Sequence, residues 1–305
     1  MKRLIIVYNA HSANYPRVQT EVIDVARKLQ GWTVGKYIVK QMSIEKNAQN
    51  LAKILQDGDL VVVAGGDGTA SAGVNGILRS QKNVTLGVLG YGNFNDLAHT
   101  LGTKSLSEII QAYEQKQTKI LWPLQIAIND RFWRFAACYF TVGLLADSTE
   151  VFDEDETREK LKQHQRSVPF SLWTLAKWYF KNRKIREFLP KVRLNGLKRS
   201  YEMTDYLAIN SKKVAKIMRG SDCYLKSDVF WRSMVNLKSF GSLVVVMLQS
   251  IFKRFPGQNI MSDVLDFEKP ASVSVQIEGE YQHLRAVRRI TVDKAKCSLK
   301  VIKLH

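Results

Sequence analysis

The sequence lacks the features of secreted or membrane-spanning proteins. Its only three cysteines, Cys138, Cys223 and Cys297, are far apart and odd in number. They form neither a disulfide framework nor a metal-binding spacing, so a reducing, cytosolic compartment is expected. The most apolar run, Leu243 to Leu248, is far shorter than the roughly 20 residues that a membrane span needs. Leu4 to Tyr8 is too short for a signal peptide and predicts a strand.

Acidic residues are scarce relative to basic ones. The chain has 28 Asp and Glu against 46 Lys and Arg, a formal net charge of +18. Residues 158–220 hold 17 of these basic side chains and 4 acidic ones. Such a field attracts anionic lipid or nucleic acid, although a solvated basic face remains the plain alternative. The sequence contains no zinc-finger, helix-turn-helix or RNA-recognition signature, so no specific nucleic-acid partner is expected.

Short apolar runs alternate with stripes of helical spacing over residues 1–122. Leu60 to Ala64 predicts a strand buried on both faces, and Ala70 to Leu78 predicts the helix that follows it. Further strands are predicted at residues 4–8, 34–39 and 84–89, and further helices around residues 18–29, 48–55 and 106–113. Repeated βα units predict an α/β fold with a doubly wound parallel sheet.

After residue 122 the pattern changes to strands without regular helices between them. Strands are predicted at residues 126–128, 132–142, 191–194, 206–210, 234–237 and 273–277, with helices near 158–186 and 239–254. The alternation of Val273, Val275 and Ile277 with polar residues is typical of antiparallel strands. We expect an antiparallel β-sandwich domain over 123–290, with a last strand at about 290–305 returning to the first domain. Its sheet edges leave a homodimer open.

The turn Gly65-Gly66-Asp67-Gly68-Thr69 lies between the clearest strand and its helix. Ligands of open α/β sheets bind at this edge. Glycines let backbone amides approach an anion, and the helix N-terminus attracts negative charge. Thr69 can cap the helix or bind a phosphate. Asp67 requires a metal or a donor between it and any phosphate.

The plain alternative for this segment is a tight turn with an N-cap. It is not a Walker A loop, because no Gly-Lys-Ser/Thr follows, and it does not match the dinucleotide fingerprint. Five residues directly after a buried strand nevertheless favour a nucleotide-phosphate loop.

The sequence resembles the diacylglycerol-kinase catalytic family, which includes bacterial lipid kinases, sphingosine kinases and ceramide kinases. The turn Gly65 to Thr69 is similar to that family's phosphate loop, and Asn75-Gly76 matches the Asn-Gly after it. Gly92-Asn93-Phe94-Asn95-Asp96-Leu97-Ala98 resembles the family's Gly-Thr-x-Asn-Asp-x-Ala segment. The resemblance implies that Gly92, Asn93, Asn95 and Asp96 lie against the nucleotide.

Three weaker matches extend the resemblance along the chain. Asn9 and Ser12 fall where the family has Asn-Pro-x-Ser-Gly, which implies nucleotide contacts. Asp228 falls at the family's Asp-Gly, where the Asp is the general base, although a lone aspartate before Phe230 is more often a turn residue. Glu278-Gly279-Glu280 resembles the family's Asp-Gly-Glu, which implies that Glu280 faces the nucleotide.

The family's pattern is altered at several positions. Ala72 stands where a glutamate is usual, and Val229 replaces the glycine after the implied base. Further departures are Ala10, Ala13, Gly90 and Asn93. They motivate one alternative, a catalytically impaired nucleotide- or lipid-binding relative. A second alternative is an NAD kinase, whose family shares the glycine turn and a similar two-domain plan.

The segment Ser167 to Phe188 mixes aromatic and basic residues, as suits the interface of an anionic bilayer. Ser239 to Phe255 is a second, apolar candidate. The alternative for both is a helix packed on the β domain.

Taken together, the resemblance implies an ATP-dependent lipid kinase. With Mg²⁺ it would transfer the γ-phosphate to a hydroxyl of diacylglycerol or a similar membrane lipid. It would act in the cytoplasm, peripherally attached to the inner face of the membrane. The sequence does not identify the lipid, the metal ligands or the oligomeric state.

Overall fold

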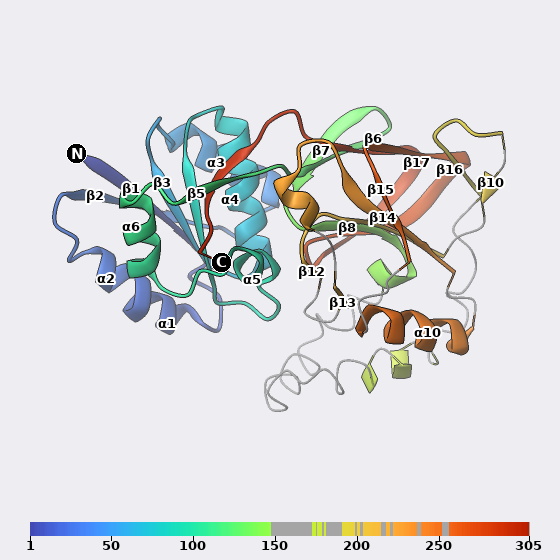
Figure 1. Cartoon of the computed structure of the whole chain (residues 1–305), viewed down its shortest axis with the longest axis horizontal. Coiled ribbons are helices and arrows are strands. Elements are labelled where there is room, and N and C mark those ends of the chain that lie inside the picture. Colours follow the sequence, from blue (N-terminus) through green and yellow to red (C-terminus); the bar gives the residue numbers. More distant parts are fainter. Residues whose placement is uncertain are drawn as a thin grey trace.

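The chain forms two regions that lie side by side, with the C-terminus returning to the first (Figure 1). The computed structural model describes residues 1–147, 191–198, 204–214, 222–236, 239–251 and 256–304. It also describes residues 173, 174, 176–178, 180, 200, 201, 218 and 219. The predicted helix over 158–186, and most of the aromatic and basic segment 167–188, therefore lie outside the described residues.

The first region is built on a six-stranded sheet with the order β2-β1-β3-β4-β18-β5. Its strands are β1 Lys2–Tyr8, β2 Trp32–Ile38, β3 Leu60–Gly65, β4 Thr85–Gly90, β5 Thr118–Leu121 and β18 Leu299–Ile302. All neighbours are parallel except β5, which runs antiparallel to β18. The C-terminal strand thus completes the sheet that the N-terminal residues begin.

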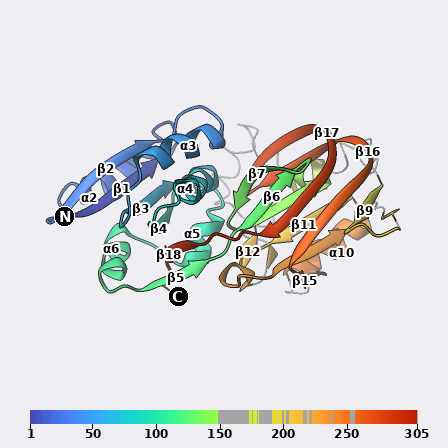
Figure 2. The ribbon, with the colours of Figure 1, turned by 90° about the horizontal axis from the view of Figure 1, so that it is seen from above.

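Helices cover both faces of this sheet (Figure 2). They are α1 Tyr15–Val18, η1 Gln19–Ile23, α2 Asp24–Ala26, α3 Ile44–Ile54, α4 Asp67–Ser80, α5 Asp96–Leu101 and α6 Leu106–Glu114. On one face Val61 and Val63 pack with the apolar side of α3 and α4. On the other, Leu60 and Val62 pack with the segment from α1 to α2 and with α6. Because β3 is buried on both faces, it is apolar throughout, as a central parallel strand requires.

The second region is a ten-stranded antiparallel sheet. Its strands are β6 Leu124–Ile128, β7 Arg131–Ala136, β8 Tyr139–Gly143, β9 Val192–Leu194, β10 Ser200–Tyr201, β11 Asp205–Ile209, β14 Phe230–Val235, β15 Gln258–Ile260, β16 Ser262–Ile277 and β17 Glu280–Lys294. Two short strands, β12 Lys213–Val214 and β13 Met218–Arg219, form a separate pair. The longest element of the ten-stranded sheet is the hairpin of β16 and β17, and residues 278 and 279 form its turn.

Apolar packing continues across the junction between the two regions. One cluster of buried side chains includes Val63 and Leu97 from the first region and Phe135, Tyr139 and Leu207 from the second. Buried amides add direct links. Asn75 on α4 donates to the Phe135 carbonyl and accepts from the Phe135 amide, both at 3.0 Å. Asn210 donates to the carbonyls of Trp122 and Ala137.

The fold class predicted from the sequence is confirmed: a parallel α/β domain is followed by an antiparallel β domain. One predicted element is wrong. Residues 132–142 do not form one strand, because the chain turns at Ala137 and Cys138 between β7 and β8. There the Cys138 amide donates to Glu278 and its carbonyl accepts from the amide of Asn210, which replaces ladder pairing.

One further expectation is shifted along the chain, and another is confirmed over the described residues. The predicted strand at 234–237 begins earlier, as β14 Phe230–Val235, and the helix near 239–254 is α10 Phe240–Ile251. Among the described residues, no helix is both long and apolar enough to cross a membrane.

The Asn75 side chain provides a test of the junction. Asn75→Ala removes both partners of the Phe135 backbone from a buried position, so the free energy of unfolding should fall by about 2–3 kcal/mol. Asn50→Ala, at an exposed position on α3, should leave it within about 0.5 kcal/mol of the starting protein. Denaturant unfolding measures both, and equal effects of the two substitutions would contradict this role of Asn75.

Candidate functional site

The first glycine turn, Gly65 to Thr69, joins the end of β3 to the start of α4. β3 ends at Gly65, and the first helical bond runs from the Ala70 amide to the Gly66 carbonyl at 3.0 Å. Thr69 is buried and folds back over Gly65, so closely that a Cβ at Gly65 would lie 2.7 Å from the Thr69 side chain. The turn therefore needs glycine at this position, and α4 directs its N-terminal amides out of the sheet edge.

The second glycine turn, residues 91–95, follows β4, the strand beside β3. The Tyr91 amide donates to the Gly65 carbonyl at 2.9 Å, which extends the pairing of the two strands into the turns. Asn95 closes the turn on itself: its Oδ1 accepts from the Gly92 amide at 2.6 Å and its Nδ2 donates to the Gly92 carbonyl at 2.9 Å. Asn95 has a φ of 57°, a conformation that asparagine adopts more readily than most residues. Asn93 lies half-buried within this turn.

The two turns contact each other through their glycines and through Asp67. A Cβ on Gly92 would lie 2.3 Å from the Gly66 Cα, so the two backbones touch. The Asp67 carboxylate accepts from the Asn95 amide at 2.9 Å and from the Asp96 amide at 2.8 Å. These two amide donors account for a carboxylate at this position, because Asp67 fixes the second turn to the first.

The loop after β1 lies beside the first turn, because Tyr8 pairs in register with Ala64. Asn9 shapes this loop, since its Oδ1 accepts from the His11 amide at 2.9 Å. Ser12 is half-buried, and its carbonyl accepts from the Tyr15 amide at 2.9 Å. Asn14, which the sequence did not single out, donates from Nδ2 to the Tyr91 carbonyl at 2.5 Å and so ties this loop to the second turn.

The β domain brings Glu280 to the first turn. The Glu280 Oε1 lies 2.8 Å from where a Cβ on Gly68 would be. Its Oε2 accepts from Arg134 Nη1 at 3.0 Å. Arg134 also donates to Glu45 on α3, so this guanidinium binds one carboxylate from each domain.

A second carboxyl, Glu278, is buried at the same hairpin turn. Its side chain is 4 % exposed, and Oε1 accepts from the Cys138 amide at 2.7 Å. Burial raises the pKa of Glu278 to about 7, and the negative charge of Asp67 adds to the rise while the Cys138 amide opposes it. Near neutral pH this group therefore exchanges a proton close to the first glycine turn.

A chain of hydrogen bonds leads from this carboxyl to Lys294, whose amine is within electrostatic range of Asp228. Cys138 joins Glu278 to Asn210, and Asn210 Oδ1 accepts from the buried amine of Lys294 at 2.6 Å. Lys294 also donates to the Trp122 and Cys223 carbonyls, both at 2.8 Å. Burial lowers the pKa of Lys294 to about 7, whereas the negative charge of the exposed Asp228 acts to raise that pKa. The structure thus brings Glu280 to Gly68 of the first glycine turn and places Asp228 within electrostatic range of Lys294.

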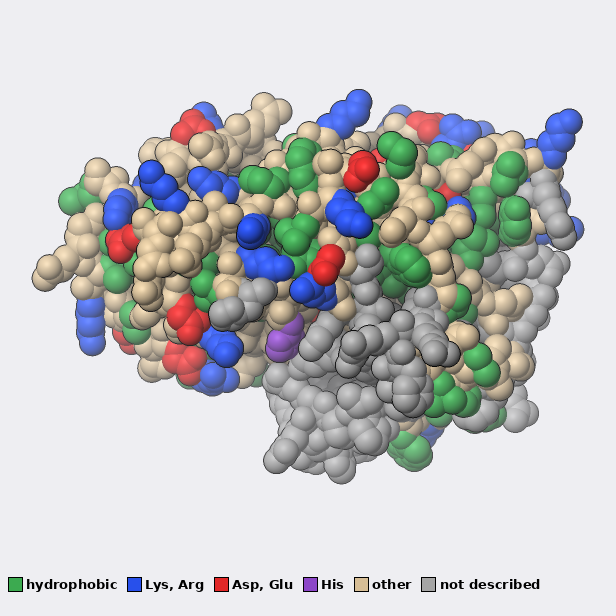
Figure 3. All heavy atoms as spheres, viewed as in Figure 1, with side chains coloured by type: hydrophobic (Ala, Val, Ile, Leu, Met, Phe, Trp, Pro, Cys, Tyr) green, Lys and Arg blue, Asp and Glu red, His purple; other side chains and the backbone are tan. Residues whose placement is uncertain are grey.

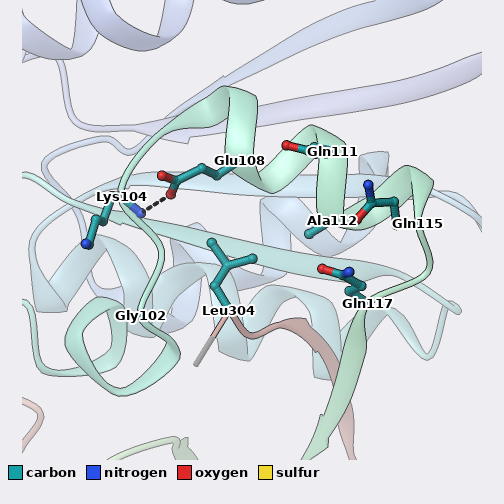
Figure 4. A pocket seen from close by; sticks show the side chains of 8 residues that line it. All are labelled: Gly102, Lys104, Glu108, Gln111, Ala112, Gln115, Gln117 and Leu304. Atoms are coloured by element: carbon teal, nitrogen blue, oxygen red, sulfur yellow. Dashed lines mark hydrogen bonds between the residues drawn. The ribbon is translucent and has the colours of Figure 1, made fainter.

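Two hollows flank the loop of residues 102–104. One, of about 450 Å³, adjoins the second glycine turn and is lined by Arg17, Glu21, Leu89, Gly90, Tyr91, Asn95, Ala98, His99, Gly102, Thr103 and Lys104. The other, of about 250 Å³, lies over α6, and its lining side chains are shown in Figure 4. Neither lining includes Gly65, Gly66 or Gly68 of the first glycine turn.

The described residues contain no group of three or more His, Cys, Asp and Glu arranged to hold a metal ion. Mg²⁺ that arrives with a nucleotide does not require such a group, because it is usually held by phosphates, waters and one or two carboxylates. Glu280, one-third exposed and directed at the first turn, is the carboxylate placed for such a role.

Comparison with known proteins confirms the resemblance inferred from the motifs. Residues 3–125 match the family model of the diacylglycerol kinase catalytic domain. A diacylglycerol kinase from Bacillus subtilis (strain 168) is 29% identical over 136 residues, which are 44% of each chain. The chain thus aligns with less than half the length of this curated relative, and the alignment of a diacylglycerol kinase from Staphylococcus carnosus, 29% identical, covers 39% of that protein.

The solved structures extend the likeness to the whole fold. A diacylglycerol kinase from Bacillus anthracis superimposes with a TM-score of 0.63 and 16% identity, covering 99% of this chain and 97% of that one. An NAD kinase from Archaeoglobus fulgidus, solved with ATP, gives a TM-score of 0.50 and 13% identity over 99% and 93% of the two chains. At these identities the likeness shows the shared two-domain fold.

Several site residues could not be identified from the sequence, because their role depends on residues of the other domain. Arg134 carries the best signal, since it is a charged residue inside the apolar run 132–142. A buried charge in such a run requires partners. Its partners, Glu45 and Glu280, are 89 and 146 residues away, and nothing in the sequence connects them.

The close approach of the two turns predicts a selective effect of Gly92→Ala. The new methyl group would collide with the Gly66 backbone and force the turns apart, so affinity for ATP should fall by about tenfold or more. Gly241→Ala, on α10 with only the Ser239 Oγ at 3.8 Å, is the matched control and should leave binding unchanged. Calorimetric titration with ATP measures both. Unaltered affinity in a folded Gly92→Ala protein would contradict this arrangement of the turns.

The raised pKa of Glu278 predicts a pH effect on nucleotide binding. As pH rises through about 7, Glu278 ionises and adds negative charge beside Asp67, so the affinity for ATP should fall by roughly threefold to tenfold. Folding stability should also decrease from the ordinary glutamate pKa up to about 7, because the folded state retains the proton.

Glu278→Gln should remove the part of the pH dependence of ATP affinity that is due to Glu278. The ratio of wild-type to variant affinity at each pH isolates it, since the terminal phosphate of ATP itself titrates nearby. Parallel profiles of the two proteins between about pH 6 and pH 8 would rule out this role of Glu278.

Proposed function

We propose that the protein is an ATP-dependent lipid kinase that transfers the γ-phosphate of ATP to a hydroxyl of diacylglycerol or a similar membrane lipid. The observation that carries the proposal is the pair of glycine turns held in contact by the bonds from the Asn95 and Asp96 amides to Asp67. It is supported by the family match over residues 3–125 and by relatives that are named diacylglycerol kinases.

The site suits the binding of nucleotide phosphates. The N-terminus of α4 and the glycine backbone present amide groups at the sheet edge, and the loop with Asn9 and Ser12 borders them. Because the turns are fixed to each other, the amides are oriented before the nucleotide arrives. Phosphoryl transfer depends mainly on such positioning and on charge stabilisation.

Two carboxylates are candidates to accept the proton of the lipid hydroxyl. Glu280 lies against Gly68 of the phosphate turn, whereas Asp228, the base implied by the family pattern, lies exposed near Lys294. Either would orient or deprotonate the alcohol as the phosphoryl group departs. Mg²⁺ that arrives with the nucleotide would neutralise phosphate charge, and Glu280, which lies against Gly68, would be a carboxylate placed to hold it.

The lipid acceptor requires contact with a membrane, and we propose that the basic surface supplies it from the cytoplasmic side. On the face shown in Figure 3, Lys and Arg side chains gather near the middle, where the two domains meet. The exposed Trp173 with Lys177 5.5 Å from its ring centre, and the exposed Val245 and Leu248 of α10, add groups that insert at an interface. The excess of 18 positive charges would attract anionic head groups.

A transfer assay with labelled ATP tests the proposal directly. The acceptors are diacylglycerol, ceramide, a sphingoid base and undecaprenol in anionic vesicles, and NAD in solution. We expect phosphate transfer to a lipid and none to NAD. Transfer to NAD alone would establish the NAD-kinase alternative, and ATP binding without transfer to any acceptor would indicate a catalytically impaired relative.

Variants in the same assay separate the two candidate proton acceptors. If Glu280 takes the proton, Glu280→Gln should lower kcat by about a hundredfold, while Asp228→Asn has a small effect. The reverse order would assign the role to Asp228. Asp222→Asn, at an exposed aspartate of the short helix η3 Asp222–Leu225, is the matched control and should retain full activity.

A further inference from the structure

We propose that Arg134 is a positioning residue of the nucleotide site, which holds the Glu280 carboxylate against the phosphate turn and closes the domain junction through Glu45. The inference rests on the proposed function in that it assigns a role within the same site. It is carried by a buried guanidinium whose two carboxylate partners come from different domains.

The burial of Arg134 shows that its contacts are obligatory. Its side chain is 1 % exposed, and it is the largest of the fully buried side chains. A guanidinium stays ionised in proteins, so a buried one must be paired and hydrogen-bonded. Arg134 Nε donates to Glu45 Oε1 at 2.9 Å, Nη2 donates to the same oxygen, and Nη1 donates to Glu280 Oε2 at 3.0 Å. The Trp133 ring lies 5.3 Å from the guanidinium carbon and covers it further.

The fork of the guanidinium joins the two domains at one point. Glu45 lies in the first turn of α3, where the helix dipole favours a carboxylate, and Glu280 begins β17 directly after the hairpin turn. The charge of Arg134 also lowers the pKa of Glu45, against the burial that raises it. Only a planar donor group with several N–H bonds in fixed directions reaches both carboxylates at once, so lysine cannot substitute for it.

The geometry of Glu280 links this contact to the phosphate turn. Oε2 is bound by Arg134, and Oε1 occupies the space that only a glycine at position 68 leaves open. A carboxylate so close to a phosphate-binding turn would repel the nucleotide. The adjacent guanidinium offsets that charge and fixes the carboxylate at the same time. Arg134 therefore acts on the nucleotide through Glu280.

A purely structural role makes a different prediction. If Arg134 only held the domains together, its bonds to Glu45 would suffice, and substitution would change stability while leaving turnover intact. Another buried pair offers the comparison: Arg232 binds Asp263 at 3.3 Å within the β domain, with exposures of 16% and 0%. Arg134 is fully buried and Arg232 partly so, but the second pair lies within the β domain and does not involve Glu280, the carboxylate against Gly68.

The experiment measures kcat, KM for ATP and melting temperature of the full chain carrying Arg134→Lys, Glu280→Gln, both together, Glu45→Gln, or the control Arg232→Lys. A misplaced Glu280 should lower kcat by about tenfold to a hundredfold in Arg134→Lys, and it should weaken ATP binding by about threefold to tenfold, seen as a rise in KM for ATP. In the Glu280→Gln background the further effect of Arg134→Lys should be below about twofold, because both act through one carboxylate. Glu45→Gln should retain more activity than Arg134→Lys, and Arg232→Lys should lower only the melting temperature.

Two results would overturn the inference. One is a kcat of Arg134→Lys equal to that of Arg232→Lys at a similar loss of melting temperature. The other is a double variant whose kcat falls by the product of the two single effects. If the wild-type protein transfers phosphate to no acceptor, the proposed function fails on its own. Calorimetric ATP affinity then replaces kcat in the same comparison, with the Arg134→Lys loss again expected to vanish in the Glu280→Gln background.

Discussion

The candidate site depends on the carboxylate of Asp67, which accepts the backbone amides of Asn95 and Asp96. These bonds add to the internal Asn95 bonds of the second glycine turn, to the Asn14 bond with Tyr91 and to the strand pairing below. With them, the Gly66 and Gly92 backbones are held in contact. The amides of two loops become one surface, which is why a single acidic residue belongs in a loop that we propose binds phosphates.

The balance of charge in this region is a second constraint. Asp67, Asp96, Glu278 and Glu280 gather where a polyanion is proposed to bind, and an ionised carboxylate would repel it. Three of them are modified differently by their surroundings. Asp67 is bonded to amides, Glu278 is buried with a raised pKa, and Glu280 is bound by Arg134. The acidic side chains of the site thus contrast with the net charge of +18 of the whole chain.

The junction between the domains brings these groups together. Asn75 binds the Phe135 backbone, and Asn210 binds the carbonyls of Trp122 and Ala137. Lys294 adds a buried amine whose three acceptors include Asn210. These polar contacts are embedded in an apolar cluster shared by both domains. Because buried polar groups are costly unless paired, they favour one arrangement of the domains, the arrangement that places Glu280 at Gly68.

The sequence by itself determined the βα pattern, both glycine turns and the change to antiparallel strands, because these follow from local periodicity and from short motifs. It also pointed to Glu280 through the family pattern. Only the tertiary structure decided what Asp67 binds, that Cys138 interrupts a predicted strand, and that Asp228 lies near Lys294. Arg134 shows the reason: its meaning depends on Glu45 and Glu280, which are distant in sequence. Local pattern specifies elements, whereas pairing between distant side chains is set by how the elements pack.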